Sequence, residues 1–209
     1  MNLLIFGASG RTGREVVKQA VSQGHLVTAF VRDPAKLDIK QADLKVFQGD
    51  VTDYASVERA VIGQEAVLCA LGSFTPTKRD PNLIDGVRNI IQAMEQAGVR
   101  RLIYLSFLGV RDGRQGLGPV VNYIVAPLLY NPIADHEVKE SLIRQSRLDW
   151  IIVRPPRLTN GRHTGVYRYG ERIAARSLIL TLSRADVADF MLKQVTDDTF
   201  VHKAPRVMY

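Results

Sequence analysis

Three glycines near the start of the chain are the first residues whose spacing could do chemistry. Residues 7–13 read Gly-Ala-Ser-Gly-Arg-Thr-Gly, so that every third residue is a glycine. In such loops one glycine permits a tight turn, one lets the backbone approach a pyrophosphate, and one lets a helix pack closely on a strand. The helix that follows offers unpaired N–H groups to the phosphates. The predicted phosphate-binding residues are Gly7, Ser9, Gly10, Arg11, Thr12 and Gly13.

The context of this loop favours a dinucleotide site over a tight turn that binds nothing. The apolar run 2–6 precedes the loop, and residues 11–23 carry a helical stripe of apolar side chains. A strand, a glycine loop and a helix within one βαβ unit form the arrangement that gives the motif its specificity. A tight turn without a ligand remains the alternative.

Arg32 ends the second predicted strand, at the position that distinguishes NADP(H) from NAD(H). In folds that prefer NAD(H), an acidic residue near this position accepts the ribose 2′-hydroxyl. An arginine would instead pair with a 2′-phosphate, because its planar guanidinium matches phosphate oxygens. Arg11 or Lys36 could be a second clamp, and the adjacent Asp33 could take the acidic role. We therefore expect NADP(H), with NAD(H) as the alternative.

Apolar strand-like runs alternate with helical patterns along the whole chain, which predicts a parallel sheet with helices on both faces. We expect one Rossmann-type, doubly wound α/β domain over residues 1–209, with ligands at the carboxyl ends of the strands. Two long loop regions, 107–132 and 155–182, are predicted to form the substrate pocket. The expected strands are 2–6, 26–31, 44–48, 66–70, 102–106 and 149–154, and the expected helices are 11–23, 53–62, 81–97, 133–146 and 184–195.

Composition narrows the class of protein and of ligand. The formal charge is +7, but the basic residues are spread along the chain, which suits small anions better than nucleic acid. The single cysteine, Cys69, cannot form an internal disulfide and stands in an apolar run. No stretch is long and apolar enough to span a membrane, and the first residues lack the pattern of a signal peptide. We expect a cytoplasmic protein, and no metal site is predicted.

Several motifs together resemble one known family. They are Ile-Phe-Gly-Ala-Ser-Gly-Arg-Thr-Gly at 5–13, Val-Arg-Asp at 31–33, Gly-Asp-Val at 49–51, Ala-Val-Leu-Cys-Ala-Leu-Gly at 66–72, Gly-Val-Arg-Arg-Leu-Ile-Tyr-Leu-Ser at 98–106 and Leu-Asp-Trp-Ile-Ile-Val-Arg-Pro-Pro at 148–156. This pattern resembles the atypical, NmrA-like short-chain dehydrogenases over nearly the whole chain. Within them it is most similar to the biliverdin reductase B and flavin reductase type.

The resemblance implies where the parts of a dinucleotide would lie. Asp50 and Val51 would lie beside the adenine, and Leu71 and Gly72 would line the cleft for the pyrophosphate and ribose. Ser106 would lie near the nicotinamide. Pro155 and Pro156 would hold the face of its ring.

Two departures from related families bear on catalysis. Ordinary short-chain dehydrogenases use Tyr-x-x-x-Lys to pass a proton, and this chain has no such pair. His136 falls at the lysine position and Pro132 at the tyrosine position, and biliverdin reductase B-like sequences also lack the pair. Arg157 stands where those reductases carry a histidine. The candidate catalytic residues are Ser106, His136 and Arg157.

The expected activity is NADPH-dependent hydride transfer to a planar conjugated acceptor, either a flavin or a biliverdin-like tetrapyrrole. Such acceptors take hydride readily, and the cofactor supplies the difficult chemistry. The expected partner is thus a small anionic substrate, which loop arginines could bind, and the protein is expected to be a monomer or weak homodimer. These arginines are Arg111, Arg114, Arg157, Arg162 and Arg168. The alternative is a non-catalytic NADP(H)-binding redox sensor or regulator.

Overall fold

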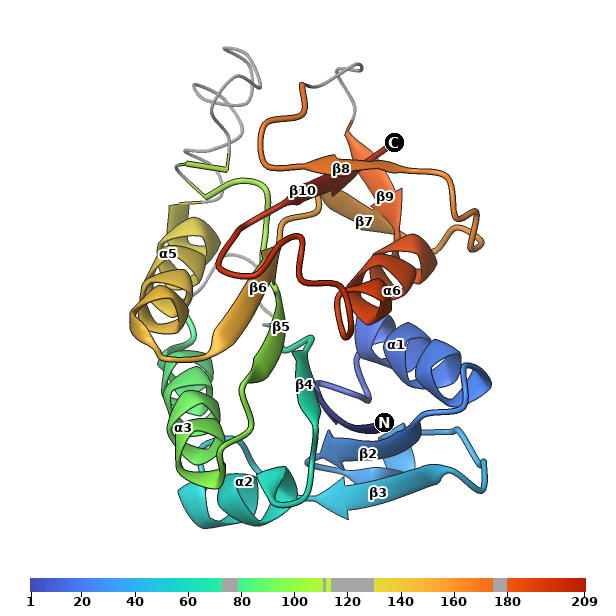
Figure 1. The fold of residues 1–209 in the computed structure, drawn as a ribbon, viewed down its shortest axis with the longest axis vertical. Coiled ribbons are helices and arrows are strands. Elements are labelled where there is room, and N and C mark those ends of the chain that lie inside the picture. Colours follow the sequence, from blue (N-terminus) through green and yellow to red (C-terminus); the bar gives the residue numbers. More distant parts are fainter. Residues whose placement is uncertain (73–78, 111, 114–129, 175–179) are drawn as a thin grey trace.

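The computed structural model describes residues 1–72, 79–110, 112–113, 130–174 and 180–209 (Figure 1). Arg111, Arg114 and the apolar stretch 120–129 of the predicted pocket lie outside these residues. No helix in the described part of the chain is both long and apolar enough to cross a membrane.

Six parallel strands form the central sheet, in the order β3-β2-β1-β4-β5-β6. Their order along the sheet reverses between β1 and β4, which is the switch point of a doubly wound fold. The predicted fold class is therefore confirmed. The strands are β1 (Asn2–Phe6), β2 (Leu26–Val31), β3 (Leu44–Gln48), β4 (Ala66–Cys69), β5 (Arg101–Leu105) and β6 (Asp149–Val153).

The helices begin and end at the residues that local chemistry favours. The Asp53 carboxylate accepts the N–H of Ala55, and the Ser183 hydroxyl accepts the N–H of Asp186. Gly98 ends a helix in the left-handed conformation, with φ of 71°. The helices are α1 (Arg11–Ser22), α2 (Tyr54–Val61), α3 (Pro81–Ala97), α5 (Tyr130–Gln145) and α6 (Arg184–Lys193), with a short 3₁₀ helix η1 (Pro34–Lys36).

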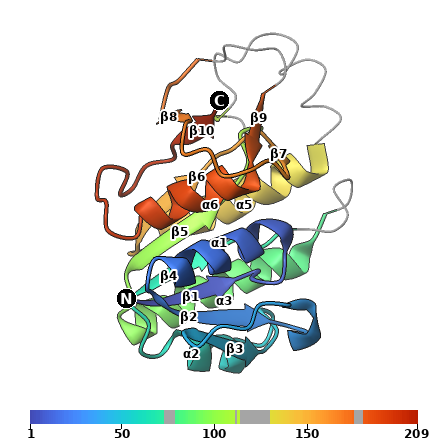
Figure 2. The same cartoon turned by 90° about the vertical axis from the view of Figure 1, so that its right-hand side faces the viewer.

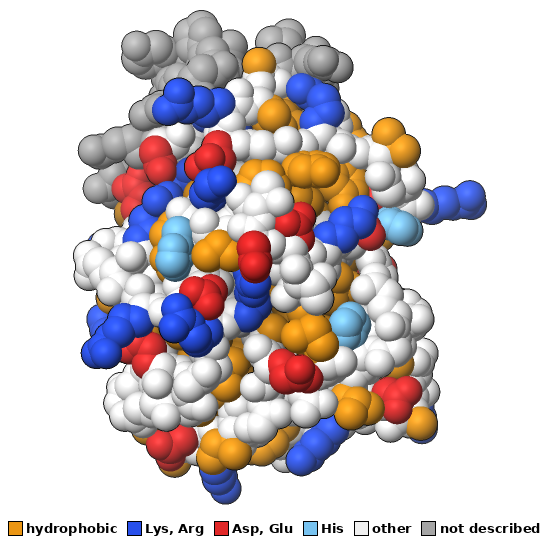
Figure 3. All heavy atoms as spheres, in the orientation of Figure 1, with side chains coloured by type: hydrophobic (Ala, Val, Ile, Leu, Met, Phe, Trp, Pro, Cys, Tyr) orange, Lys and Arg blue, Asp and Glu red, His pale blue; other side chains and the backbone are white. Residues whose placement is uncertain are grey.

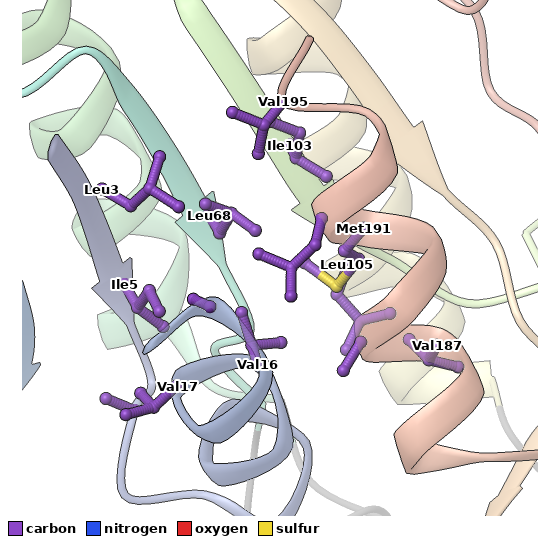
Figure 4. Packing of buried hydrophobic residues seen from close by; sticks show 14 of the residues in the cluster. Leu3, Ile5, Val16, Val17, Leu68, Ile103, Leu105, Val187, Met191 and Val195 are labelled. Atoms are coloured by element: carbon purple, nitrogen blue, oxygen red, sulfur yellow. The ribbon is translucent and has the colours of Figure 1, made fainter. Parts of the chain in front are cut away.

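Successive residues of the buried strands serve two separate cores. Leu3 and Ile5 of β1 pack toward α1 and α6, whereas Leu4 and Phe6 pack toward α2 and α3. Figure 4 shows the first core between the sheet and the helices α1 and α6, and Figure 2 shows these two helices side by side on one face. Helices therefore cover both faces, as the alternation of strands and helices predicts. Cys69 is buried in the second core, and burial raises the pKa of its thiol to about 11.

Four short strands lie above the central sheet (Figure 1), and the sequence pattern does not predict them. β8 pairs with β10, and β7 pairs with β9. The described residues of the segment 155–182 therefore include short strands, which are held by pairing with residues distant in the sequence. These strands are β7 (Arg157–Thr159), β8 (Arg168–Gly170), β9 (Thr181–Ser183) and β10 (Arg206–Met208).

Charge on the visible face is mixed. Lysine and arginine side chains lie between aspartate and glutamate side chains over the face drawn in Figure 3. This distribution agrees with the spread of basic residues along the sequence.

Candidate functional site

A groove of about 350 Å³ opens at the carboxyl ends of β1, β2 and β4, at the switch point of the sheet. It brings together residues from the glycine loop, the end of β2, the segment after β3 and the end of β4. Among the predicted cofactor residues, those that line it are Gly7, Ser9, Gly10, Arg32, Asp50, Val51, Leu71 and Gly72. Phe30, Asp80, Asn82 and Leu83 also line it, and the sequence analysis did not identify them.

Two glycines shape the bottom of this groove. Gly7 has φ of +76°, and a Cβ at this position would lie 2.6 Å from the carbonyl oxygen of Ala70. Gly10 is the N-cap of α1, where no side chain caps the helix and no acidic residue occupies the first turn. The first N–H groups of α1 can therefore bind an anion, and the groove fits the pyrophosphate of a dinucleotide.

Gly13 lies elsewhere and has a different role. A Cβ at Gly13 would lie 2.0 Å from the carbonyl oxygen of Gly7, so this glycine allows α1 to pack on the loop. Thr12 is buried beside it, and neither residue lines the groove. Arg11 is exposed and lies near Arg184, whose pKa is lowered by burial and then by the charge of Arg11. Arg11 therefore sits near the start of α6 and not among the groove residues.

Arg14 is a residue that the sequence analysis missed. Its Nε donates to the carbonyl oxygen of Ser9 at 3.1 Å, and another guanidinium nitrogen donates to the carbonyl oxygen of Lys36. Arg14 thus fastens the glycine loop to the turn that follows Arg32. The sequence did contain one indication of this role, because Arg14 directly follows the last glycine of the loop, Gly13.

The neighbours Arg32 and Asp33 take different roles. Arg32 is exposed at the edge of the groove. The pKa of Asp50 is lowered mainly by its hydrogen bonds with the N–H and hydroxyl of Thr52, and to a smaller extent by the charge of Arg32. The Asp33 carboxylate turns away to cap η1, where it accepts the N–H of Ala35 at 3.1 Å, and it lies 3.6 Å from Lys36 Nζ. Asp33 does not line the groove, so Arg32 is the residue available to a ribose 2′-substituent.

We expect Arg32→Ala to weaken NADPH binding roughly 10-fold and to leave NADH binding nearly unchanged, because only NADPH carries the 2′-phosphate. Titration of the protein with each reduced cofactor measures both affinities. Lys18→Ala is the matched control, since Lys18 of α1 pairs with Glu15 and does not line the groove, and it should keep the native ratio. Equal affinity of the native protein for NADPH and NADH would contradict the prediction.

The segment at 50–51 is held rigidly beside the groove. Asp50 accepts the N–H of Thr52 at 2.9 Å and its hydroxyl at 2.8 Å. Asn89 of α3 donates to the carbonyl oxygen of Val51 at 2.9 Å, and a Cβ at Gly86 would lie 2.6 Å from the side chain of Val51. Asp50 and Val51 therefore keep one position at the rim, as an adenine-binding wall requires.

Ser106 stands at the end of β5, one strand beyond β4 and about 10 Å across the sheet from β1. Its hydroxyl donates to Oε1 of Glu140 at 2.5 Å, and His136 Nδ1 lies 3.4 Å from the same oxygen. The structure thus brings together the two predicted residues Ser106 and His136, and it adds a carboxylate that the sequence analysis missed.

Arg154, after β6, holds this carboxylate in place. Its Nε lies 3.1 Å from Oε1 of Glu140, and a second nitrogen contacts Oε2. Both side chains are nearly fully buried. Burial would lower the pKa of Arg154, but hydrogen bonds and charges of Glu140 and Asp112 raise it, so Arg154 stays charged. Its contact with Asp112, at 2.8 Å, ties the segment after β5 to the same cluster.

The surroundings of His136 keep its ring neutral. Burial, and then the positive charge of Lys139, lowers its pKa to about 3, and Asp135 opposes this shift only in part. Asp135 is itself buried and accepts Arg79 Nε at 3.0 Å and the N–H of Asp80 at 2.7 Å. Asp135 thereby joins α5 to the start of α3 at the rim of the groove.

The remaining predicted residues make no hydrogen bond to Ser106 or His136 in the described part of the chain. Pro155 is buried, and its carbonyl oxygen accepts the N–H of Leu108 at 2.9 Å. Arg157 is exposed on β7, and the described residues show no hydrogen bond between it and Ser106 or His136. Arg162 is exposed. Arg168 donates to the carbonyl oxygens of Ala174 and Tyr209, so it holds the C-terminal strand pair and is not a loop arginine available to a substrate.

Known proteins resemble the chain in sequence and in fold. Residues 7–198 match the NAD(P)H-binding family. An uncharacterized chloroplastic protein of Arabidopsis thaliana is 32% identical over 176 residues, covering 78% of this chain and 61% of its own length. The (4-alkanoyl-5-oxo-2,5-dihydrofuran-3-yl)methyl phosphate reductase of Streptomyces griseus is 29% identical over 153 residues, covering 73% of this chain and 46% of its own length. The chain thus spans less than two thirds of either relative.

One solved structure shows how far the fold is shared. ChuY of Escherichia coli O157:H7, described as an anaerobilin reductase, superposes with a TM-score of 0.79 at 22% identity, covering 99% of this chain and 96% of that chain. The family match, the six-stranded sheet and the glycine loop agree. The chain therefore belongs to the NAD(P)H-binding family.

Proposed function

We propose that this protein is an NADPH-dependent reductase that transfers hydride to a planar conjugated acceptor, such as a flavin or a linear tetrapyrrole. The observation that carries the proposal is a groove at the glycine loop together with a cluster of Ser106, His136 and Glu140 at the end of β5. The sequence has no Tyr-x-x-x-Lys pair, and the Ser106 hydroxyl already donates to a carboxylate. Such a site suits an acceptor that needs no strong acid from the protein.

The reaction balances with solvent as the proton source. When bound, NADPH supplies a hydride from its reduced nicotinamide, and the acceptor gains that hydride and one proton while NADP⁺ forms. The protein binds and orients both partners near the end of β5. Two similar proteins support this proposal. The Streptomyces griseus relative is named as a reductase of a phosphate ester, which supports an anionic acceptor, and ChuY is described as an anaerobilin reductase, which supports a reduction.

Anaerobic stopped-flow mixing of NADPH-loaded protein with acceptors tests the proposal. We expect loss of the NADPH absorbance with at least one of flavin mononucleotide, riboflavin, quinones and biliverdin. Arg157→Ala should raise the KM for flavin mononucleotide more than that for riboflavin, because only the first carries a phosphate. If no hydride leaves the bound cofactor with any acceptor, the protein is an NADP(H)-binding sensor.

Turnover should depend little on the two residues beside the acceptor. Ser106→Ala and His136→Ala should each lower kcat less than about 10-fold, whereas a general acid typically contributes about 10²–10⁴-fold. The pKa of His136 is lowered from its ordinary value to about 3, so the ring stays neutral in the folded protein. Its protonation opposes folding only as the pH falls below about 6.5. The rate should therefore show no step near neutral pH from this histidine, and a 10³-fold loss in His136→Ala would contradict solvent protonation.

A further inference from the structure

Hydrogen bonds link His136, Ser106 and Glu140, and their direction decides whether Ser106 can donate or accept a further hydrogen bond. Glu140 accepts four contacts with both of its oxygens: Oε1 takes the Ser106 hydroxyl at 2.5 Å and Arg154 Nε at 3.1 Å, and Oε2 takes a second Arg154 nitrogen and lies 3.7 Å from Arg144. The contacts with arginine nitrogens come from groups that can only donate, so both oxygens of Glu140 act as acceptors. The distance of 2.5 Å is typical of a hydroxyl that donates to a carboxylate.

A serine hydroxyl has one proton and two lone pairs. Because the proton of Ser106 is directed at Glu140, its oxygen offers only lone pairs to His136 and to any other neighbour. His136 Nδ1 lies 3.4 Å from this oxygen, and the ring is neutral. A neutral ring carries one N–H, and only an N–H at Nδ1 satisfies this contact. Nε2 of His136 then carries no proton.

We propose that Glu140 is a positioning residue that fixes Ser106 as a donor toward the protein, so that toward a bound ligand Ser106 can only accept a hydrogen bond. Arg154 holds the Glu140 carboxylate with two nitrogens, and one of these nitrogens also donates to Asp112. In this arrangement His136 Nδ1–H donates to the Ser106 oxygen, and the Ser106 hydroxyl donates to Glu140. Neither Ser106 nor Nε2 of His136 is then a proton donor, in contrast to the serine and tyrosine of a dehydrogenase that protonates a carbonyl.

The ligand group that fits such a site is an amide N–H. Resting on the proposed function, we assign it to the carboxamide of the nicotinamide, which carries two N–H donors. The free lone pair of Ser106 would accept one of them. In this assignment Ser106 selects the orientation of the ring, and Glu140 acts only through Ser106.

Nitrogen NMR of the histidine rings tests the orientation without cofactor or turnover. The chain has four histidines, and His136→Ala identifies the signals of His136 in ¹⁵N-histidine-labelled protein. We expect the Nδ1–H form of His136 in the native protein and the Nε2–H form in Glu140→Met and in Ser106→Ala. Asp112→Asn is the matched control, because it removes the other carboxylate on Arg154 and leaves Ser106 untouched. Ser106→Ala keeps the buried Glu140–Arg154 pair, so the test stands even if Glu140→Met folds poorly.

An Nε2–H ring in the native protein would overturn the proposed orientation, and an unchanged ring in folded Glu140→Met would overturn the role of Glu140. The carboxamide contact has a separate test, which is binding of NADP⁺ and of its 3-acetylpyridine analogue, which lacks the amide N–H. Ser106→Ala should weaken NADP⁺ about 2- to 10-fold and leave the analogue unchanged. Equal losses for both would overturn the contact. Absence of any NADP⁺ binding by the native protein would refute the proposed function, while the NMR result would stand.

Discussion

Arg154→Ala is expected to lower the free energy of unfolding by about 3–5 kcal/mol. The variant leaves the buried carboxylate of Glu140 without its buried cationic partner, and desolvation of an unpaired charge is costly. Asp112 loses its buried partner in the same step. Urea denaturation followed by circular dichroism measures the change, which should shift the midpoint and leave the slope nearly constant.

Arg144→Ala is the control for this prediction. Arg144 contacts the same two carboxylates, Asp112 at 3.2 Å and Glu140 at 3.7 Å, but its side chain is 38% exposed whereas that of Arg154 is 4% exposed. An ion pair with that exposure contributes about 1 kcal/mol or less. The double variant Glu140→Met/Arg154→Met should recover much of the loss, because it removes both buried charges. Similar losses in Arg144→Ala and Arg154→Ala would contradict the assignment of the buried pair.

Substitutions at two glycines of the same loop are expected to change different properties, cofactor binding for Gly10 and stability for Gly13. Gly10→Val should weaken dinucleotide binding at least about 10-fold, because its side chain enters the groove where a phosphate would approach the backbone. The fold should tolerate it better than a change at Gly13, because the backbone at Gly10 is extended and a Cβ there needs the Gly7 carbonyl oxygen, 3.1 Å away, to shift only slightly. Gly13→Ala should instead lower stability by about 1–3 kcal/mol or more, because its Cβ would lie 2.0 Å from the carbonyl oxygen of Gly7.

Thermal melts and cofactor titrations of both variants separate the two effects. Gly24→Ala is a control for the loss of a glycine, because no atom lies within 4 Å of a Cβ there, although its φ of +80° alone adds some strain. If Gly10→Val binds the cofactor like the native protein, the groove is not the dinucleotide site. If Gly13→Ala melts like the native protein, its glycine is not required for packing of α1.

The sequence by itself determined the parts of this protein whose physics is local. Asp53 and Ser183 cap the helices that follow them, Gly98 ends α3, and the glycine loop between an apolar strand and an amphipathic helix predicts a dinucleotide site. Each of these signals acts over a few residues, so it can be recognised without the fold. The sequence does not decide whether Arg32 or Asp33 meets the ribose 2′-substituent. The two are adjacent in sequence, and only the turn at η1 shows that Asp33 is used as a cap.

Only the tertiary structure decided the surroundings of Ser106. Glu140 is 34 residues from Ser106 and 14 from Arg154, and the three meet because α5 packs beside β5 and β6 with one particular rotation. The sequence of α5 has no clear apolar face that would set this rotation, so its buried charged residues Asp135, Lys139 and Glu140 look like surface residues. The same reason hid the four short strands, because three residues carry too little pattern and their pairing depends on distant partners. Contacts between distant residues are set by how whole helices and strands pack, and this packing cannot be read from local sequence patterns.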